Sequence, residues 1–289
     1  MSFQKLDTLG RKLEALEHAL SILGADEATH MAVGGGEKRA EAMAHLAGMY
    51  HAQATAPEIA DWIEAARPET EDQTLALAEF KRQYINATCL PTEFVTRRTA
   101  ATMRSEQLWR DLRAKGDWDS FLPALEGVVA LVREEAQLRS EALNLAPYDA
   151  LMDQYDPGNR TADLDAVFAD LKGFLKDFVP EALAAQEARL AKRPRKSLNG
   201  PYPIEKQREL GLAAMRAVGF DFTHGSLAVS HHPFCGGVPT DVRMTTRYRT
   251  DDFLSSLMAV LHETGHALYE QGLPQDWSHW PLGKARGMG

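Results

Sequence analysis

The hydrophobic and polar positions of this chain repeat mostly with the period of an α-helix. Leucines near the start recur in alternating steps of three and four, which places them on one stripe of a single helix. They are Leu6, Leu9, Leu13, Leu16, Leu20 and Leu23. Three heptads at the start of a chain are more typical of one helix packed on a helical body than of a coiled coil. Gly34, Gly35 and Gly36 then interrupt the pattern.

Proline and glycine divide the following residues into further predicted helices. The breaks include Pro57, Pro68, Pro91 and Gly116. The predicted helices cover about 37–52, 57–66, 70–90, 92–115, 118–144, 161–191 and 203–218. We find no internal repeat and no linker long enough to separate domains. The pattern therefore predicts a mainly α-helical protein, with residues 1–289 in a single domain.

Residues 226–249 depart from this helical pattern. β-branched and alternating residues surround Gly236 and Gly237, with two prolines nearby, and predict a small β-element. Because this element runs directly into the last predicted helix, an exposed strand here could pair with an extended peptide.

The last predicted helix runs from about Asp251 to Gln271. Thr250 is its predicted N-cap, and Gly272 followed by Pro274 can end it. Its apolar residues are numerous enough to predict that the helix is buried, with its histidines in a low-dielectric interior. These apolar residues are Phe253, Leu254, Leu257, Met258, Leu261, Leu268 and Tyr269.

This last helix contains the segment His262-Glu263-Thr264-Gly265-His266. Residues four apart on a helix lie on one face about 5–6 Å apart, so both imidazoles can reach one small cation. Glu263 projects away from the line between the histidines, so its carboxylate can act as a general base at the open position of the metal. H-E-x-x-H on a helix is typical of zinc metallohydrolases. We therefore predict one Zn²⁺ per subunit at His262 and His266, with Co²⁺ or Mn²⁺ as possible substitutes.

A catalytic zinc site of this kind needs a third protein ligand. The metzincin pattern is excluded, because Tyr269 and Gly272 stand where that class has glycine and histidine. Glu270 lies one turn beyond the second histidine, too far along the same helix to converge on the metal, and fits a solvated or supporting carboxylate better. The remaining candidates, none of which has a recognisable ligand spacing, are Asp276, His279 and Cys235.

Four ordered motifs resemble those of the M32 metallocarboxypeptidases, the family typified by carboxypeptidase Taq. Residues 148–158 resemble the family's YDALLDxYEPG block. Residues 232–234 match its HPF motif, residues 241–245 match DxRxT, and residues 262–266 match HExxH. The resemblance extends over nearly the whole chain and implies a gluzincin-like helical metallopeptidase body, with the small β-element before the zinc helix.

The resemblance also implies where the third ligand lies. In this family a glutamate from an HES-type motif, a short distance after HExxH, completes the zinc site. The chain stops at Gly289, where that motif would be about to begin. The third ligand is therefore expected beyond Gly289, and these residues are expected to be the N-terminal part of a longer, truncated enzyme. The resemblance also implies that the protein forms a homodimer.

An exopeptidase must also bind the terminal carboxylate of its substrate, which a guanidinium does through two hydrogen bonds. Arg243 and Arg247 are candidates, and the alternative for both is a structural salt bridge with Asp241 or Asp252. His232 of the HPF motif is a further candidate, with a core-packed histidine as its alternative. The predicted substrate-binding set comprises Arg243, Arg247, His232, Asp241 and Thr245.

Three functions remain open. The first is a zinc-dependent carboxypeptidase of broad specificity that hydrolyses the C-terminal peptide bond of peptides, with Glu263 transferring protons between water and the leaving amine. The second is a non-catalytic helical fragment without a complete metal site. The third is a zinc endopeptidase with the same chemistry and an open cleft.

Composition and charge exclude several other classes. The formal net charge of −9 argues against a nucleic-acid partner, and the basic run at residues 192–196 is more typical of a solvated helix end. No stretch approaches the roughly 18 apolar residues of a membrane span, and the first residues lack the apolar core of a signal peptide. Cys89 and Cys235 form no disulfide framework and are expected to be reduced. These features predict a cytoplasmic protein.

Overall fold

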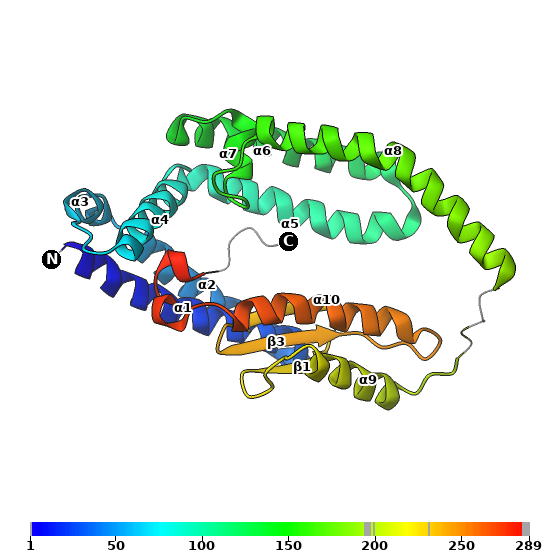
Figure 1. The fold of residues 1–289 in the computed structure, drawn as a ribbon. Helices are drawn as coiled ribbons and strands as arrows, with labels where there is room; N and C mark the ends of the chain where they lie inside the picture. Colours follow the sequence, from blue (N-terminus) through cyan, green and yellow to red (C-terminus); the bar gives the residue numbers. More distant parts are fainter. Residues whose placement is uncertain (1, 194–197, 199, 231, 285–289) are drawn as a thin grey trace. The chain divides into compact units, whose positions relative to one another are not determined.

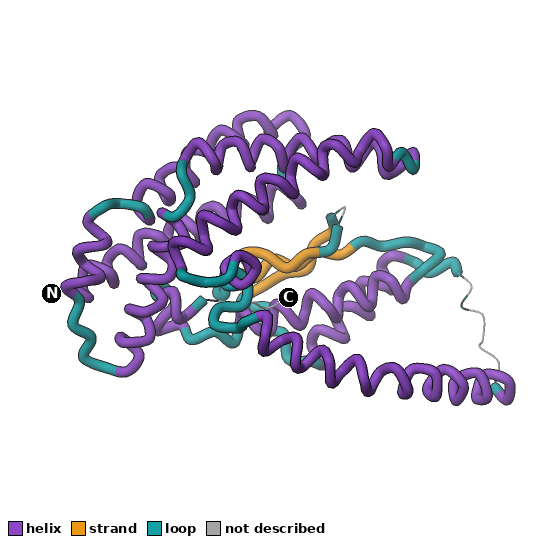
Figure 2. The backbone as a smooth tube through the Cα atoms, turned by 90° about the horizontal axis from the view of Figure 1, so that it is seen from above, coloured by secondary structure: helices purple, strands orange, loops and turns teal. Residues whose placement is uncertain are grey.

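The computed structural model describes residues 2–193, 198, 200–230 and 232–284. The described residues form two compact units, one from residues 2–81 and 198–284 and the other from residues 82–193. The mainly α-helical fold with a small β-element before the last helix is confirmed (Figures 1 and 2). The single domain over residues 1–289 stays a prediction.

The first unit begins with helices and ends with the sheet and the last helix. Its helices before the sheet are α1 (Ser2–Thr29), α2 (Gly36–Ala54), α3 (Glu58–Ala65), the first part of α4 (Glu71–Thr88) and α9 (Ile204–Ala217). The strands are β1 (Gly225–Val229), β2 (Phe234–Val238) and β3 (Asp241–Thr246). They are followed by α10 (Phe253–Gln271) and by the short 3₁₀ helices η2 (Gln275–Trp277) and η3 (Pro281–Gly283); a further one, η1 (Val33–Gly35), precedes α2.

The second unit is entirely helical within its described residues. It contains the end of α4, followed by α5 (Thr92–Lys115), α6 (Trp118–Leu143), α7 (Pro147–Met152) and α8 (Thr161–Lys192). Most of the predicted helix boundaries differ from these by one or two residues, because proline and glycine mark the ends locally. The short helix α7 was missed. No helix in the described part of the chain combines the length and apolar character that a membrane crossing requires.

The three strands form one mixed sheet in the order β1-β3-β2. β1 pairs parallel to β3 with Leu227 opposite Met244, and β2 pairs antiparallel to β3 with Cys235 opposite Met244. Gly237 in β2 has φ of +86°, and a Cβ there would lie 2.2 Å from the carbonyl oxygen of Asp241. Only glycine fits this close turn between β2 and β3 without strain.

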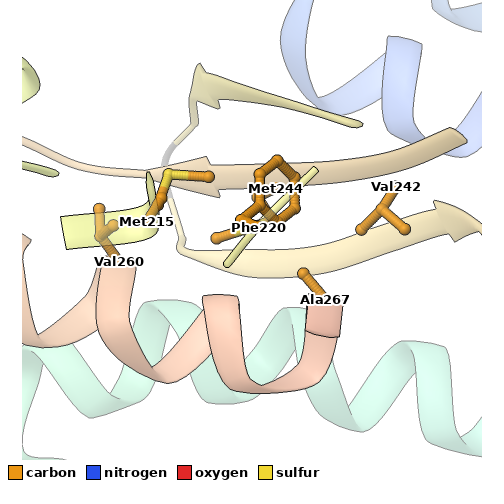
Figure 3. Close-up of a cluster of buried hydrophobic side chains, with 6 residues drawn as sticks. All are labelled: Met215, Phe220, Val242, Met244, Val260 and Ala267. Carbon is orange, nitrogen blue, oxygen red and sulfur yellow. The ribbon is translucent and has the colours of Figure 1, made fainter. Parts of the chain in front are cut away.

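A hydrophobic cluster fixes α10 against the sheet (Figure 3). Its buried residues come from α9, from the turn after α9, from β3 and from α10; they are Met215, Phe220, Val242, Met244, Val260 and Ala267. Val242 and Met244 alternate along β3 and therefore point to the same face, the face on which α10 lies. The sheet and α9 thus determine which side of α10 is buried.

The N-terminal helix α1 is fixed to the segment that follows α10. The Asp7 carboxylate lies 2.7 Å from His279 Nε2 and accepts a hydrogen bond of 2.8 Å from Trp280 Nε1. Burial raises the pKa of Asp7, but hydrogen bonds from Trp280, His279 and Arg11 outweigh it, so the pKa lies below its usual value. The two ends of this unit are therefore held together by a paired, ionised carboxylate.

This attachment gives a testable prediction at Gly10. A Cβ on Gly10 would lie 2.1 Å from the carbonyl oxygen of His279, so Gly10→Ala is expected to destabilise the protein by roughly 1–3 kcal/mol. Gly24→Ala in the same helix is the matched control, since its Cβ would meet only Met43 Cε at 3.8 Å, and it is expected to stabilise by roughly 0.5–1 kcal/mol. Urea denaturation measures both, and equal effects would contradict the close contact.

Candidate metal centre

The helix that carries the H-E-x-x-H segment starts two residues later than its predicted beginning. The side chain of Asp252 accepts a hydrogen bond of 3.1 Å from the backbone N–H of Ser255, which makes Asp252 the N-cap of α10. The predicted cap at Thr250 was wrong. An aspartate at this position satisfies a free N–H group and also places a negative charge at the positive end of the helix dipole.

The two histidines of α10 converge through the same ring nitrogen. His262 Nε2 and His266 Nε2 lie 3.2 Å apart, and the rings are nearly perpendicular at 83°. Two zinc–nitrogen distances of about 2.05 Å at a tetrahedral angle require the nitrogens to be about 3.3 Å apart. The pair therefore fits the separation that one Zn²⁺ requires of two imidazole ligands.

The burial of α10 differs from the prediction. Leu254, Met258 and Leu261 are 42%, 62% and 37% exposed, and His262 is also exposed, while His266 is half-buried. The prediction of a fully buried helix with both histidines in the interior was therefore wrong for the described residues. Only one face of α10 packs on β3 and α9, and its buried residues are Ser256, Val260, Glu263, Thr264 and Ala267.

Glu263 lies on the buried face of α10 and is 8% exposed. It is next to His262 in sequence but points to another side of the helix, as expected of a base that does not bind the metal directly. Burial, together with the nearby carboxylates of Glu270 and Glu263, raises the pKa of the Cys235 thiol to about 12. Cys235 of β2 is therefore a near neighbour of both carboxylates and carries a proton at neutral pH in this structure.

Glu270 is a half-buried carboxylate one turn beyond His266. Burial raises its pKa, and the neighbouring His266 offsets part of that effect. It lies too far along the helix to join both histidines at one cation, so its place beside His266 fits the supporting role that its spacing predicts.

The described residues contain no group of three or more histidine, cysteine, aspartate or glutamate side chains placed to hold a metal ion. His279 is engaged with Asp7 and is only 5% exposed. The expected third ligand beyond Gly289 lies outside the described residues. His262 and His266 therefore stay the two residues of the described chain that are predicted to bind the metal, and the third ligand stays a prediction.

The predicted substrate-binding residues fall into two groups. Arg243 binds Asp241 through two hydrogen bonds, Nε to Oδ1 at 2.5 Å and one of its terminal nitrogens to Oδ2 at 2.6 Å. This is the structural salt bridge named above as the alternative, and the Asp241 carboxylate raises the pKa of Arg243. Arg247 and His232 are exposed.

Thr245 has a structural position in the β-element. Its side chain is fully buried, and its hydroxyl donates to the carbonyl of His232 at 3.2 Å. The same oxygen accepts hydrogen bonds from the backbone N–H of Phe234 and from the hydroxyl of Ser230. Thr245 therefore fixes the loop that carries His232, a role that sequence spacing alone could not reveal because the partners lie 11–15 residues away.

The family model of carboxypeptidase Taq (M32) metallopeptidases matches residues 5–289. The chain belongs to this family. Thermostable carboxypeptidase 1 of Thermus thermophilus is 36% identical over 306 residues, covering 100% of this chain and 58% of the relative. Thermostable carboxypeptidase 1 of Pyrococcus furiosus is 31% identical, covering 92% of this chain and 53% of the relative. The predicted family is thereby confirmed.

Solved M32 structures have the same fold. Metallocarboxypeptidase 1 of Trypanosoma cruzi superposes with a TM-score of 0.92 at 37% identity, over 99% of this chain and 57% of that one. The carboxypeptidase of Pyrococcus furiosus gives a TM-score of 0.88 at 28% identity, again over 99% of this chain and 57% of that one. The chain therefore spans a little over half the length of the M32 relatives that it matches.

Proposed function

We propose that this chain forms the metal-binding part of a zinc-dependent carboxypeptidase that removes C-terminal residues from peptides with broad specificity. The observation that carries the proposal is the 3.2 Å approach of His262 Nε2 and His266 Nε2, with Glu263 between them in sequence and on the buried face of the helix. Membership of a metallopeptidase family and the names of the relatives support the choice of peptide substrates.

The residues of this chain divide the chemistry among them. Zn²⁺, when bound, supplies a Lewis acid that acidifies water and polarises the scissile carbonyl. His262 and His266 hold the ion, and a third ligand comes from outside the described residues. Glu263 takes a proton from the attacking water and delivers it to the leaving amine. Co²⁺ or Mn²⁺ could occupy the same ligands.

The small sheet offers a way to position the substrate. β2 is an edge strand of the described sheet, and its Cys235 lies close enough to Glu263 for the carboxylate to affect the thiol. An extended peptide that pairs with this edge would lie beside the base. Arg247 and His232, both exposed, are the candidates for contact with the bound peptide, and Arg243 contributes only if it exchanges Asp241 for the substrate carboxylate.

Metal titration is the first test of this proposal. His266→Ala is expected to weaken Zn²⁺ binding by at least about tenfold, because it removes one of the two predicted ligands. Substitution of residues that only hydrogen-bond to metal ligands already lowers metal affinity by about tenfold or more. His45→Ala, an exposed histidine on α2, is the matched control and should leave the affinity unchanged. Binding that survives His266→Ala at full strength would sink the assignment.

Product analysis separates the carboxypeptidase from the two alternatives. The enzyme assayed is a fusion in which residues 1–289 are joined to the portion of the Thermus thermophilus relative outside its match. Single residues released stepwise from a free C-terminus, but not from an amidated one, are expected. Internal cleavage would support an endopeptidase instead, and a fusion that binds zinc without cleaving any peptide would favour a non-catalytic role.

We also propose that the protein is a cytoplasmic homodimer. The family resemblance supports a homodimer, and the two free cysteines, Cys89 and Cys235, are compatible with the reducing environment of the cytoplasm.

A further inference from the structure

Helix α8 carries an apolar surface that the other helices of its unit leave exposed. It is 32 residues long, and none of its residues is buried. Eight of its large apolar side chains are between 39% and 60% exposed; they are Val167, Phe168, Leu171, Phe174, Leu175, Phe178, Val179 and Leu183. We call these eight residues the α8 stripe.

The α8 stripe occupies one side of the helix. Its successive members are one, three or four residues apart, which is the spacing of a broad helix face that packs against another element. The rings of Phe174 and Phe178, one turn apart, already stack on each other with centroids 4.9 Å apart. Single exposed apolar residues are common on protein surfaces, but contiguous apolar patches are rare. A patch as long as the α8 stripe therefore marks an interaction surface.

Charges along the edges of the stripe restrict what can cover it. Asp163, Asp170 and Asp177 recur every seven residues and therefore follow one edge. The other edge is mixed, with Asp165, Lys172 and Lys176 along it. Two copies of α8 packed antiparallel would bring the acidic edges face to face, and that repulsion disfavours such a symmetric pair.

The relatives indicate a different occupant. The match leaves 42% of the Thermus thermophilus relative and 43% of the Trypanosoma cruzi structure without a counterpart in this chain. We propose that the α8 stripe is the docking surface for this remaining portion of an M32 polypeptide, through an amphipathic helix with basic residues facing Asp163, Asp170 and Asp177. The proposal rests on family membership and not on the proposed activity.

Hydrogen exchange tests the docking directly. The probe is the fusion described above, compared with residues 1–289 alone. Amides of residues 167–183 are expected to exchange at least about tenfold more slowly in the fusion, because a covered helix opens less often than an exposed one. Neither metal nor peptide hydrolysis enters this measurement, so its failure is distinct from failure of the proposed function.

Variants assign the protection to the stripe. The double substitution Phe174→Asp with Phe178→Asp is expected to return exchange in the fusion to the rate of residues 1–289 alone. Ala166→Asp with Ala184→Asp adds the same two negative charges on the opposite side of α8 and is expected to preserve the protection. Peptides containing Met215 and Val260, which are buried in the cluster with β3, report whether the rest of the protein stays folded.

Three results would overturn the proposal. The first is unchanged exchange at 167–183 in a fusion whose Met215 and Val260 peptides remain protected. The second is protection that survives the double substitution. The third is self-association of residues 1–289 that the double substitution abolishes, without protection in the fusion, which would make a second copy the occupant.

Discussion

Replacing Glu263 with glutamine in the fusion is expected to lower kcat/KM for release of the C-terminal residue by roughly 10²–10⁴-fold, the range that a positioned acid–base group contributes. Glutamine has nearly the same size and can occupy the same buried position, so the fold should be kept. It cannot accept a proton from water, however. Hydrolysis of a peptide with a free C-terminus, measured alongside zinc affinity, checks the prediction.

The zinc affinity of the Glu263→Gln variant decides between a base and a ligand. A base that lies beside the metal can be neutralised without loss of zinc, so the affinity should stay close to that of the unchanged protein. Glu270→Gln is the matched control, because it neutralises another carboxylate on the same helix, one that is half-buried and lies next to His266. It should reduce the rate much less. If Glu263→Gln instead loses zinc as His266→Ala does, Glu263 is a ligand and the proposed mechanism is wrong.

Replacing Glu135 with glutamine is expected to destabilise the second unit by roughly 3–5 kcal/mol, the cost of breaking a buried ion pair. Glu135 of α6 is 3% exposed and accepts a hydrogen bond from Arg98 of α5 and another, at 2.8 Å, from Arg139 Nε. Arg139 is itself buried and also donates to the side chain of Asn86 on α4. Without the carboxylate, the Arg139 charge would stay buried with only neutral acceptors.

The neighbouring residue offers the matched control for Glu135. Glu134 pairs with Arg97 across the same two helices, but both side chains are about half exposed. Water screens such a pair, so Glu134→Gln should have a much smaller effect. Urea denaturation followed by helical circular dichroism compares the two variants. If both substitutions lowered the free energy of unfolding by similar amounts, the burial of the Glu135 ion pair would not increase its contribution to stability.

The effect of Glu135→Gln should depend on pH. Burial raises the pKa of Glu135, but the hydrogen bonds from Arg98 and Arg139 outweigh it and hold the pKa below the usual value of 4.5. The stabilisation by the carboxylate is therefore complete above pH 4.5 and is lost as the pH falls through the folded-state pKa. The difference in free energy of unfolding between the two proteins should be largest near neutrality and should shrink in acid.

Local patterns in the sequence were sufficient for most of the helices and for the close approach of His262 and His266. Proline and glycine mark the ends of α5, α6 and α9 within one residue of the prediction, because capping and chain breaking depend only on neighbouring residues. The spacing of His262 and His266 likewise needs only the helix period. Both are short-range features, and the structure bears out the helices and the 3.2 Å approach of the two rings.

Features that depend on distant residues were not predictable in this way. The N-cap of α10 shifted to Asp252, and the helix proved to be buried on one face only. The apolar pattern of a helix does not specify whether one face or all faces are buried. In this structure β3 and α9 cover one face of α10. For Arg243 the sequence left two roles open, substrate binding and a salt bridge, and the structure shows the salt bridge with Asp241.

The sequence by itself thus determined the helical class, the family and the histidine pair with its glutamate, since each is written in spacings of a few residues. Only the tertiary structure decided that Asp7 meets His279 across 272 positions, that Thr245 supports the loop of His232, and that the α8 stripe is uncovered. Such contacts depend on which surfaces meet after the chain has folded, and no local period of polar and apolar residues specifies that choice.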